Sequence, residues 1–337
     1  MFRTKCCEST AANSNVAGKA QFYRDNLVKG LKAALGGFPF VPLLFWPFFL
    51  PAFQGLPVRT SKPSSTVVSG NLAFAHVEKL VSFGPRPPGS PGIGRAQAYI
   101  LEILRSLSLE VEQQDFLAST PNGPTSMKNI VGKSHGQQSQ AIILASHYDT
   151  LLMKNAVFVG ANDGGSSTGL LLELSRVLSK TKNKLSLWFV FFDGEEAQRQ
   201  WSETDGLYGS RYFVDRLKSE GHLGQIKAMI LMDMIGDIDL KIENDLSSTS
   251  WLMQVVRKSA RDFGYGRYLS SVEKGIVDDH IPFIRAGIPA VDLIDYDFGF
   301  NNSLWHTPND TLDKVSPQSL KVAGDIVVRT IESLTAN

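Results

Sequence analysis

Acidic side chains and histidines follow several apolar runs of this chain at the point where each run ends. "SHYD" comes directly after Ala145, "DGEE" follows Phe192, and "DMIGD" follows Met232. In open α/β sheets, ligands bind beyond the carboxyl ends of the strands. If the apolar runs are parallel strands, the pattern brings five candidate side chains to one edge: His147, Asp149, Glu195, Glu196 and Asp233.

The adjacent glutamates Glu195 and Glu196 indicate a metal site. Clustered carboxylates cannot all stay ionised in a poorly solvated cleft unless a positive charge joins them. These motifs contain few lysines or arginines. A metal ion is therefore the natural counter-charge, and oxygen ligands mixed with imidazole suit zinc. One glutamate can bind the metal while its neighbour stays free as a general acid and base.

Two further motifs carry side chains that could bind a metal. "GANDGGSS" places Asp163 in a glycine-rich turn, and "LWHTPNDT" presents His306 in a loop that its proline keeps from being helical. An aspartate before a helix is often only an N-cap residue, so Asp163 alone has a structural interpretation. Its occurrence together with the histidine and "DGEE" motifs favours a ligand.

The elements that must position these residues alternate along the chain. Three- and four-residue spacing of apolar side chains predicts helices, and short runs that are apolar on both faces predict central parallel strands. "GPRPPGSPG", residues 84–92, is predicted to be an irregular loop. Helices are expected at residues 72–83, 95–107, 168–178 and 317–334, and strands at 141–145, 185–192, 228–232 and 288–294. This alternation predicts a three-layer α/β/α fold with a mostly parallel central sheet.

Composition limits the classes of protein that fit. The 337 residues are 43% apolar, which is ordinary for a globular protein, and a net charge of +1 gives no reason to expect nucleic acid as a partner. Both cysteines, Cys6 and Cys7, lie near the N-terminus. The remainder of the chain therefore contains neither a disulfide nor a cysteine nucleophile.

The N-terminal residues 1–69 are predicted to be a leader ahead of one catalytic domain, residues 70–337. Residues 33–53 are apolar and uncharged, and lysines and arginines precede them. This layout is typical of an export signal or an N-terminal membrane anchor, although four prolines would interrupt a helix there. A polar linker follows at residues 60–69. We expect the domain to be exported to the periplasm, the outside or the secretory pathway, with membrane contact possible through this segment.

The order "HYD … GANDGG … DGEEA … MDMIG … DDHIPF … HT" resembles the zinc aminopeptidase family M28, and more closely its glutaminyl-peptide cyclotransferase branch. The resemblance covers most of residues 72–337. The matches specific to the branch are "ASTPNGP" from Ala118, "DGEEAQRQWSETDGLYGSR" from Asp193, "DDHIPFIRAGIP" from Asp278, and the tryptophan before the histidine in "WHT".

This resemblance implies a role for each matching residue. Asp163, Glu196 and His306 would hold one zinc ion, with Glu195 as the general acid and base. Asp233 and Asp278 would orient the reacting groups, and Trp201 and Trp305 would line the substrate pocket. The implied substrates are peptides or proteins that begin with glutamine, and the products are a pyroglutamyl peptide and ammonia.

Alternatives stay open at this point. In M28 aminopeptidases, the residues that match His147 and Asp233 bind a second zinc, so a two-zinc hydrolase that releases the first residue of a peptide is also compatible. A catalytically inactive binding domain is a third possibility. Where animal cyclases have a histidine, this chain has Asp292, and the role of the nearby His280 is expected to be structural hydrogen bonding rather than ligation.

Overall fold

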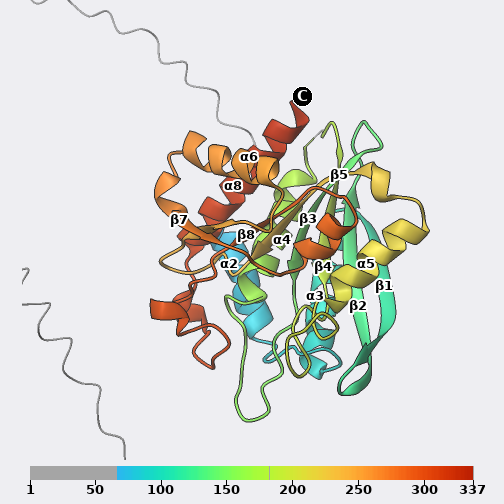
Figure 1. Ribbon diagram of the computed structural model, residues 1–337, viewed down its shortest axis with the longest axis vertical. Helices are drawn as coiled ribbons and strands as arrows, with labels where there is room; N and C mark the ends of the chain where they lie inside the picture. Colours follow the sequence, from blue (N-terminus) through green and yellow to red (C-terminus); the bar gives the residue numbers. More distant parts are fainter. Residues whose placement is uncertain (1–66, 182, 337) are drawn as a thin grey trace, which may run out of the picture. The chain divides into compact units, whose positions relative to one another are not determined.

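The computed structural model describes residues 67–181 and 183–336, which belong to one compact unit (Figure 1). Residues 1–66 of the predicted leader lie outside the described residues, and its export and membrane roles remain predictions from the sequence. Its last three residues, 67–69, belong to the described unit, where Val68 is buried in the core and Ser69 caps α2. Among the described helices, none combines the length and the apolar character needed to cross a membrane.

Seven α-helices and eight strands make up the described part of the chain. The helices are α2 (Gly70–Val81), α3 (Pro91–Ser106), α4 (Gly165–Leu178), α5 (Tyr208–Ser219), α6 (Ser250–Asp262), α7 (His280–Arg285) and α8 (Pro317–Thr335). The strands are β1 (Glu110–Thr120), β2 (Gly123–Ser134), β3 (Ala141–His147), β4 (Ser186–Phe192), β5 (Ile226–Asp233), β6 (Ile242–Asp245), β7 (Leu269–Lys274) and β8 (Ala290–Ile294).

Six strands form the main sheet in the order β1-β2-β4-β3-β5-β8. The neighbours β4, β3, β5 and β8 run parallel, whereas β1 and β2 form an antiparallel hairpin at one side. Strands β6 and β7 pair in a separate small sheet. The predicted mostly parallel sheet is confirmed, and the four predicted strands are its parallel members.

Alternating side chains of the central strands enter two hydrophobic cores, one on each face of the sheet. Ile142 and Leu144 of β3 pack with residues of α2, α3, α4, α6 and α8, whereas Ile143 and Ala145 pack with α5 and α7. This alternation follows from the two-residue period of a strand. The three-layer α/β/α architecture is thereby confirmed (Figure 1).

Serine caps and prolines set the beginnings of two helices. The hydroxyl oxygen of Ser90 accepts a hydrogen bond from the backbone N–H of Ile93, and Pro91 begins α3. Ser316 and Pro317 do the same for α8, where the acceptor bonds the N–H of Gln318. Proline suits the first helical position because no N–H is needed there. α3 thus begins inside the stretch that was predicted to be irregular to residue 92.

Candidate active site and metal centre

The carboxyl ends of the parallel strands place the candidate side chains at one edge of the sheet. His147 is the last residue of β3, Asp233 is the last residue of β5, and Glu195 and Glu196 follow β4 after a two-residue turn. Asp163 comes from the turn before α4, and His306 comes from the loop between β8 and α8. These segments are far apart in the sequence, and the fold alone brings them together.

Two glycines allow the backbone to bend at this edge. Gly164 has a φ of 72°, and a Cβ atom there would lie 2.6 Å from the carbonyl oxygen of Asp149 and 2.9 Å from the ring of His147. Gly194 has a φ of 71°, and its Cβ would lie 2.5 Å from the sulfur of Met127. Residues other than glycine rarely adopt such φ values, so both turns require glycine.

Asp163, Glu196 and His306 converge within metal-binding distance of one another. His306 Nε2 lies 3.2 Å from Asp163 Oδ2 and 3.2 Å from Glu196 Oε1. Neither of those buried oxygens has a hydrogen-bond partner. Buried acceptors without partners are rare, and a cation between them would satisfy both. The donor set of two carboxylates and one imidazole fits zinc.

His147, Asp163 and Asp233 form a second group that shares Asp163 with the first. His147 Nε2 lies 3.2 Å from Asp163 Oδ1 and 3.1 Å from Asp233 Oδ1. Asp163 therefore turns one oxygen to each group, as a carboxylate that bridges two metal ions would. The geometry is compatible with one ion or with two.

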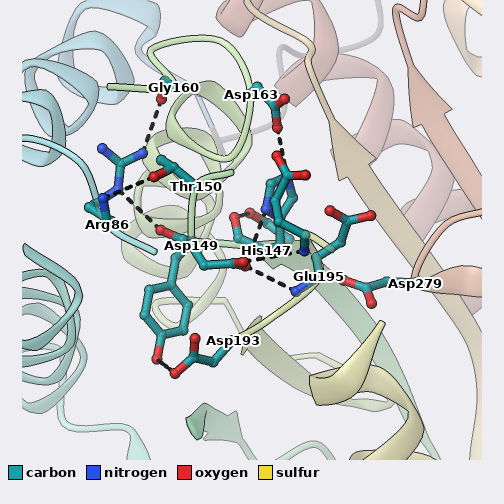
Figure 2. A network of polar contacts seen from close by, with 12 residues as sticks. Arg86, His147, Asp149, Thr150, Gly160, Asp163, Asp193, Glu195 and Asp279 are labelled. Atoms are coloured by element: carbon teal, nitrogen blue, oxygen red, sulfur yellow. Dashed lines mark hydrogen bonds and ion pairs between the residues drawn. The ribbon is translucent and has the colours of Figure 1, made fainter. Parts of the chain in front are cut away.

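Asp149 links the histidine motif to the adjacent glutamates (Figure 2). Its two carboxylate oxygens accept the backbone N–H groups of Glu195 and Glu196 at 3.1 and 3.3 Å. Oδ1 also lies 3.5 Å from His147 Nδ1. Asp149 thus fixes the backbone of the two glutamates and lies beside the imidazole ring of His147.

Burial controls the protonation of the acids at this site. It raises the pKa of Glu195 well above its usual range, with Asp278 and Glu196 adding to the rise and His147 opposing it. Burial and then Asp163 raise the pKa of Glu196 to about 7. Without a cation, the protein must hold protons here to limit charge repulsion.

Burial has the opposite effect on an imidazole, because it disfavours the positively charged form. Burial lowers the pKa of His306, but its contacts with Asp163 and Glu196 outweigh burial and raise the value to about 10. For Asp163, contacts with His147 and His306 outweigh burial and lower the pKa. Protonated imidazoles therefore supply the positive charge of the metal-free site, which is the charge that a bound zinc ion would supply instead.

His306 has a φ of 52°, and Met234, directly after Asp233, has a φ of 47°. Such values are uncommon outside glycine, asparagine and aspartate, and they cluster at functional sites where surrounding contacts impose them. Trp305 stacks on the ring of His306, with centroids 4.1 Å apart, and it also contacts Tyr296. Aromatic packing therefore surrounds the loop of His306 in its uncommon conformation.

The candidate residues open into a cavity of about 780 Å³. Glu195, Asp233 and Asp278 line it together with the ligand residues, and Trp201 and Trp305 form parts of its wall. Trp201 is 41% exposed. Further wall residues that sequence reasoning did not identify are Leu151, Arg199, Gln200, Met234, Lys274, Ile276, Val277, Ile294 and Tyr296.

Glu195 lies beside the metal-binding side chains without joining either group. Its carboxyl group faces the cavity and belongs to neither group of metal-binding side chains, although the residue is only 8% exposed. Asp278 is 4% exposed, and burial followed by the charge of Asp233 raises its pKa to about 6. The structure therefore brings together every side chain that the sequence assigned to the site.

His280 and Asp292 lie behind the site rather than in it. Both are fully buried, and His280 Nε2 is 3.2 Å from Asp245 Oδ2 while its Nδ1 is 4.0 Å from Asp292 Oδ2. Burial, followed by the charge of Asp278, raises the pKa of Asp292 well above its usual range. His280 belongs to neither group of metal-binding side chains.

Two positioning residues had no recognised signal in the sequence. Arg86 is fully buried and donates hydrogen bonds to the backbone carbonyls of Tyr148, Val159 and Gly160 (Figure 2). Tyr148 begins one loop and Val159 and Gly160 end it, so Arg86 joins the two ends of that loop. The carboxylate of Asp310 accepts the N–H groups of Asn162 and Asp163 at 2.7 and 3.0 Å. Asp310 therefore joins the loop of His306 to the turn of Asp163.

Comparisons with known proteins agree with this geometry. The sequence model of peptidase family M28 matches residues 129–331. A glutaminyl-peptide cyclotransferase of Drosophila melanogaster is 32% identical over 289 residues, which cover 77% of this chain and 81% of that relative. The Bos taurus enzyme of the same name is 32% identical over 274 residues, covering 70% of this chain and 75% of the relative.

Solved structures show the same similarity. A glutaminyl cyclase from an Acidobacteriales bacterium superposes with a TM-score of 0.78 at 37% identity, covering 84% of this chain and 99% of that one. A Zn-dependent exopeptidase from Parabacteroides distasonis superposes with a TM-score of 0.72 at 26% identity, covering 80% and 99%. The chain belongs to peptidase family M28 and, within it, to the glutaminyl-peptide cyclotransferases.

Proposed function

We propose that this protein cyclises N-terminal glutamine residues of peptides or proteins to pyroglutamate, with zinc as its cofactor. One observation carries the proposal. Asp163, Glu196 and His306 converge beside an unligated, buried Glu195 in a cavity large enough for a peptide end. Relatives that share two thirds or more of this chain's length are named for this reaction.

The reaction joins two groups of one substrate molecule. The α-amine attacks the carbon of the glutamine side-chain amide, a new C–N bond closes the ring, and the bond to the amide nitrogen breaks to release ammonia. Because both groups belong to the same residue, the pocket gains rate by holding them in contact. When bound by Asp163, Glu196 and His306, zinc supplies a Lewis acid for the side-chain carbonyl.

Glu195 moves the proton that this reaction transfers. Its carboxylate takes a proton from the attacking amine and returns it to the leaving nitrogen, so no net proton is consumed within the pocket. A pKa raised by burial brings the carboxyl group closer to the acidity that such a shuttle needs near neutral pH. Asp233 and Asp278 line the same cavity and can accept hydrogen bonds from the α-amine.

A second candidate function is aminopeptidase activity. The group of His147, Asp163 and Asp233 supports it because it could hold a second ion. A leucine aminopeptidase precursor from Bacteroides thetaiotaomicron also superposes with a TM-score of 0.72 at 26% identity. In that case Glu195 would activate water for hydrolysis instead of relaying a proton within the substrate.

A comparison of peptides by mass spectrometry separates the two functions. The purified zinc-loaded protein is incubated with a Gln-initiated peptide, a Leu-initiated peptide, and an N-acetylated Gln peptide as control. Loss of one ammonia from the free Gln peptide alone supports the cyclase. Release of the first residue from the Leu peptide would overturn it in favour of the peptidase. The acetylated peptide should stay unchanged because its amine cannot attack.

A further inference from the structure

One wall of the cavity carries a cation that the chemistry above does not use. Arg199 lines the cavity, is exposed, and follows the ligand Glu196 by three residues. Within the part of the chain that the structure describes, its guanidinium group forms no ion pair. An arginine at a pocket wall without an acidic partner is available for a ligand.

The backbone of Arg199 is held by Asp205. The carboxylate of Asp205 accepts the backbone N–H groups of Gln198, Arg199 and Gln200 at 2.8 to 2.9 Å. It also accepts the hydroxyl of Tyr208 at 2.9 Å. Four donors on one carboxylate fix the turn that carries Arg199, so the position of the arginine is built into the fold.

The side chain of Arg199 is held by the β1–β2 hairpin. Its Nε donates to Asn122 Oδ1 at 3.2 Å, and Asn122 Nδ2 donates in turn to the carbonyl oxygen of Gln198 at 2.9 Å. The terminal guanidinium nitrogens keep their hydrogens for another partner. A guanidinium group oriented in this way loses less entropy when it binds a carboxylate.

The second cation of the cavity is already neutralised. Lys274 Nζ lies 2.7 Å from Glu243 Oε1, and Glu243 is only 2% exposed. Lys274 also lies over the ring of Tyr296, 5.5 Å from its centroid. Arg199 is therefore the lining cation whose charge remains uncompensated among the described residues.

The cavity is also larger than one glutamine residue requires. At about 780 Å³ it lies within the range of sites that enclose a drug-sized ligand, so the residues after the glutamine have room inside it. The proposed cyclisation places the α-amine among the acids around Glu195, and the residues that follow can then contact the wall that carries Arg199. The acids would repel a negatively charged substrate unless a cation on the exit path attracts it.

We propose that Arg199 binds a carboxylate on the C-terminal side of the substrate's glutamine, so that acidic peptides are favoured. The inference rests on the proposed cyclisation, because that reaction defines which residue of the substrate is the N-terminal glutamine and which residues follow it. The carboxylate has two possible sources, an aspartate or glutamate side chain, or the free C-terminus of a short peptide. Both present the planar pair of oxygens that guanidinium groups bind.

Six peptide substrates test this inference. C-terminally amidated Gln-Ala-Ala-Ala is the neutral reference, and amidated versions with glutamate at the second, third or fourth position carry the side-chain carboxylate. The unamidated peptide carries the terminal carboxylate, and an amidated peptide with lysine reverses the charge. We expect kcat/KM of the wild-type enzyme to be about fivefold higher for at least one carboxylate peptide than for the reference.

Arg199→Gln should remove this preference, so that kcat/KM becomes equal for the carboxylate peptides and the neutral peptide. Arg199→Lys should retain part of it, because the charge stays while the two-oxygen geometry is lost. Lys274→Met is the matched control and should keep the full preference. Raising the salt concentration to about 0.5 M should weaken the preference, since the contact is exposed to solvent.

A binding measurement gives a readout that needs no turnover. The same peptides are titrated into the Glu195→Gln variant and into the double variant Glu195→Gln/Arg199→Gln, and binding is monitored by tryptophan fluorescence. Loss of acid selectivity only in the double variant supports the inference even if the cyclase assignment fails. Equal kcat/KM and equal binding for acidic and neutral peptides would overturn it, as would a preference that survives in Arg199→Gln.

Discussion

Acidic side chains lie near the amino ends and near the carboxyl ends of the parallel strands, in very different surroundings. At the amino ends of β3 and β4, a cavity of about 490 Å³ is lined by Glu110 and Glu112. Lys133 and Arg216 each lie 2.8 Å from Glu112, and His135 lies 2.7 Å from Glu110. These contacts outweigh burial and lower the pKa of Glu112.

The carboxyl ends of these strands have acids without lysine or arginine partners. Glu195, Glu196 and Asp278 are nearly fully buried, and burial raises the pKa of each. The difference shows that acidic residues in a cavity are not in themselves a metal site. At the amino ends, protein cations complete the charge balance, whereas at the carboxyl ends that balance requires protons or a metal ion.

The largest effect is expected for Glu195→Gln. Loss of the proton carrier should reduce kcat for Gln peptides by about 10²- to 10⁴-fold, while zinc content and thermal stability stay near those of the wild type. Glu196→Gln is the companion variant and should lose zinc as well. If Glu195→Gln retained full activity, Glu195 could not be the proton carrier, and its proposed difference in role from Glu196 would be wrong.

Asp310→Asn should weaken zinc binding by about 10- to 100-fold. An asparagine side chain has one acceptor oxygen for two backbone N–H groups, so the turn of Asp163 loses one of its supports. Zinc affinity is measured by competition with a chelator of known strength. Asp313→Asn changes an exposed acid of the same loop and should leave the affinity unchanged.

Metal-free protein should become less stable as the pH rises from 5 to 8. The pKa of Glu196 is about 7 in the fold against an ordinary value of 4.5. Because the pKa of Glu196 is raised in the fold, its contribution to the free energy of unfolding is complete below pH 4.5 and is lost as the pH rises past 7. The loss is on the order of 2 kcal/mol and is visible as a falling melting temperature. A zinc-loaded sample should not follow this trend.

The smallest effect is expected at the other end of the strands. Glu112→Gln should destabilise the fold by less than about 1 kcal/mol at pH 7 and leave kcat/KM unchanged. Because the pKa of Glu112 is lowered, its contribution is present above pH 4.5 and disappears as the pH falls below that value. Denaturant unfolding at two pH values measures this. A loss of activity would mean that the two cavities communicate.

The central strands and their terminal acids could be predicted because each strand is apolar on both faces and ends directly in polar residues. His147 and Asp233 are such terminal residues, and the resemblance to a known family added Asp278. The hairpin β1–β2 was not predicted, since its burial alternates irregularly and many of its side chains are polar. Half-exposed strands of this kind have a weak apolar pattern.

The positioning residues could not be predicted for a different reason. The guanidinium group of Arg86 donates its hydrogen bonds to backbone carbonyl groups. Since every residue has such a carbonyl, the sequence does not indicate which ones Arg86 contacts. Asp310 bonds backbone N–H groups 147 and 148 residues away in the sequence. Such partners depend on how loops pack in three dimensions, and residue types alone carry no record of them.

The contacts of Arg86 fix the base of one loop and leave the tip of that loop able to vary in sequence and length. They close the base of the loop from Tyr148 to Gly160, whereas residues 154–157 at its tip are exposed. Because lengthening a loop with a fixed base costs little free energy, we expect insertions at this tip to be tolerated without moving Asp149 or Asp163. Since Leu151 of the same loop lines the cavity, we expect changes in this loop to alter the substrate range while the catalytic side chains stay in place.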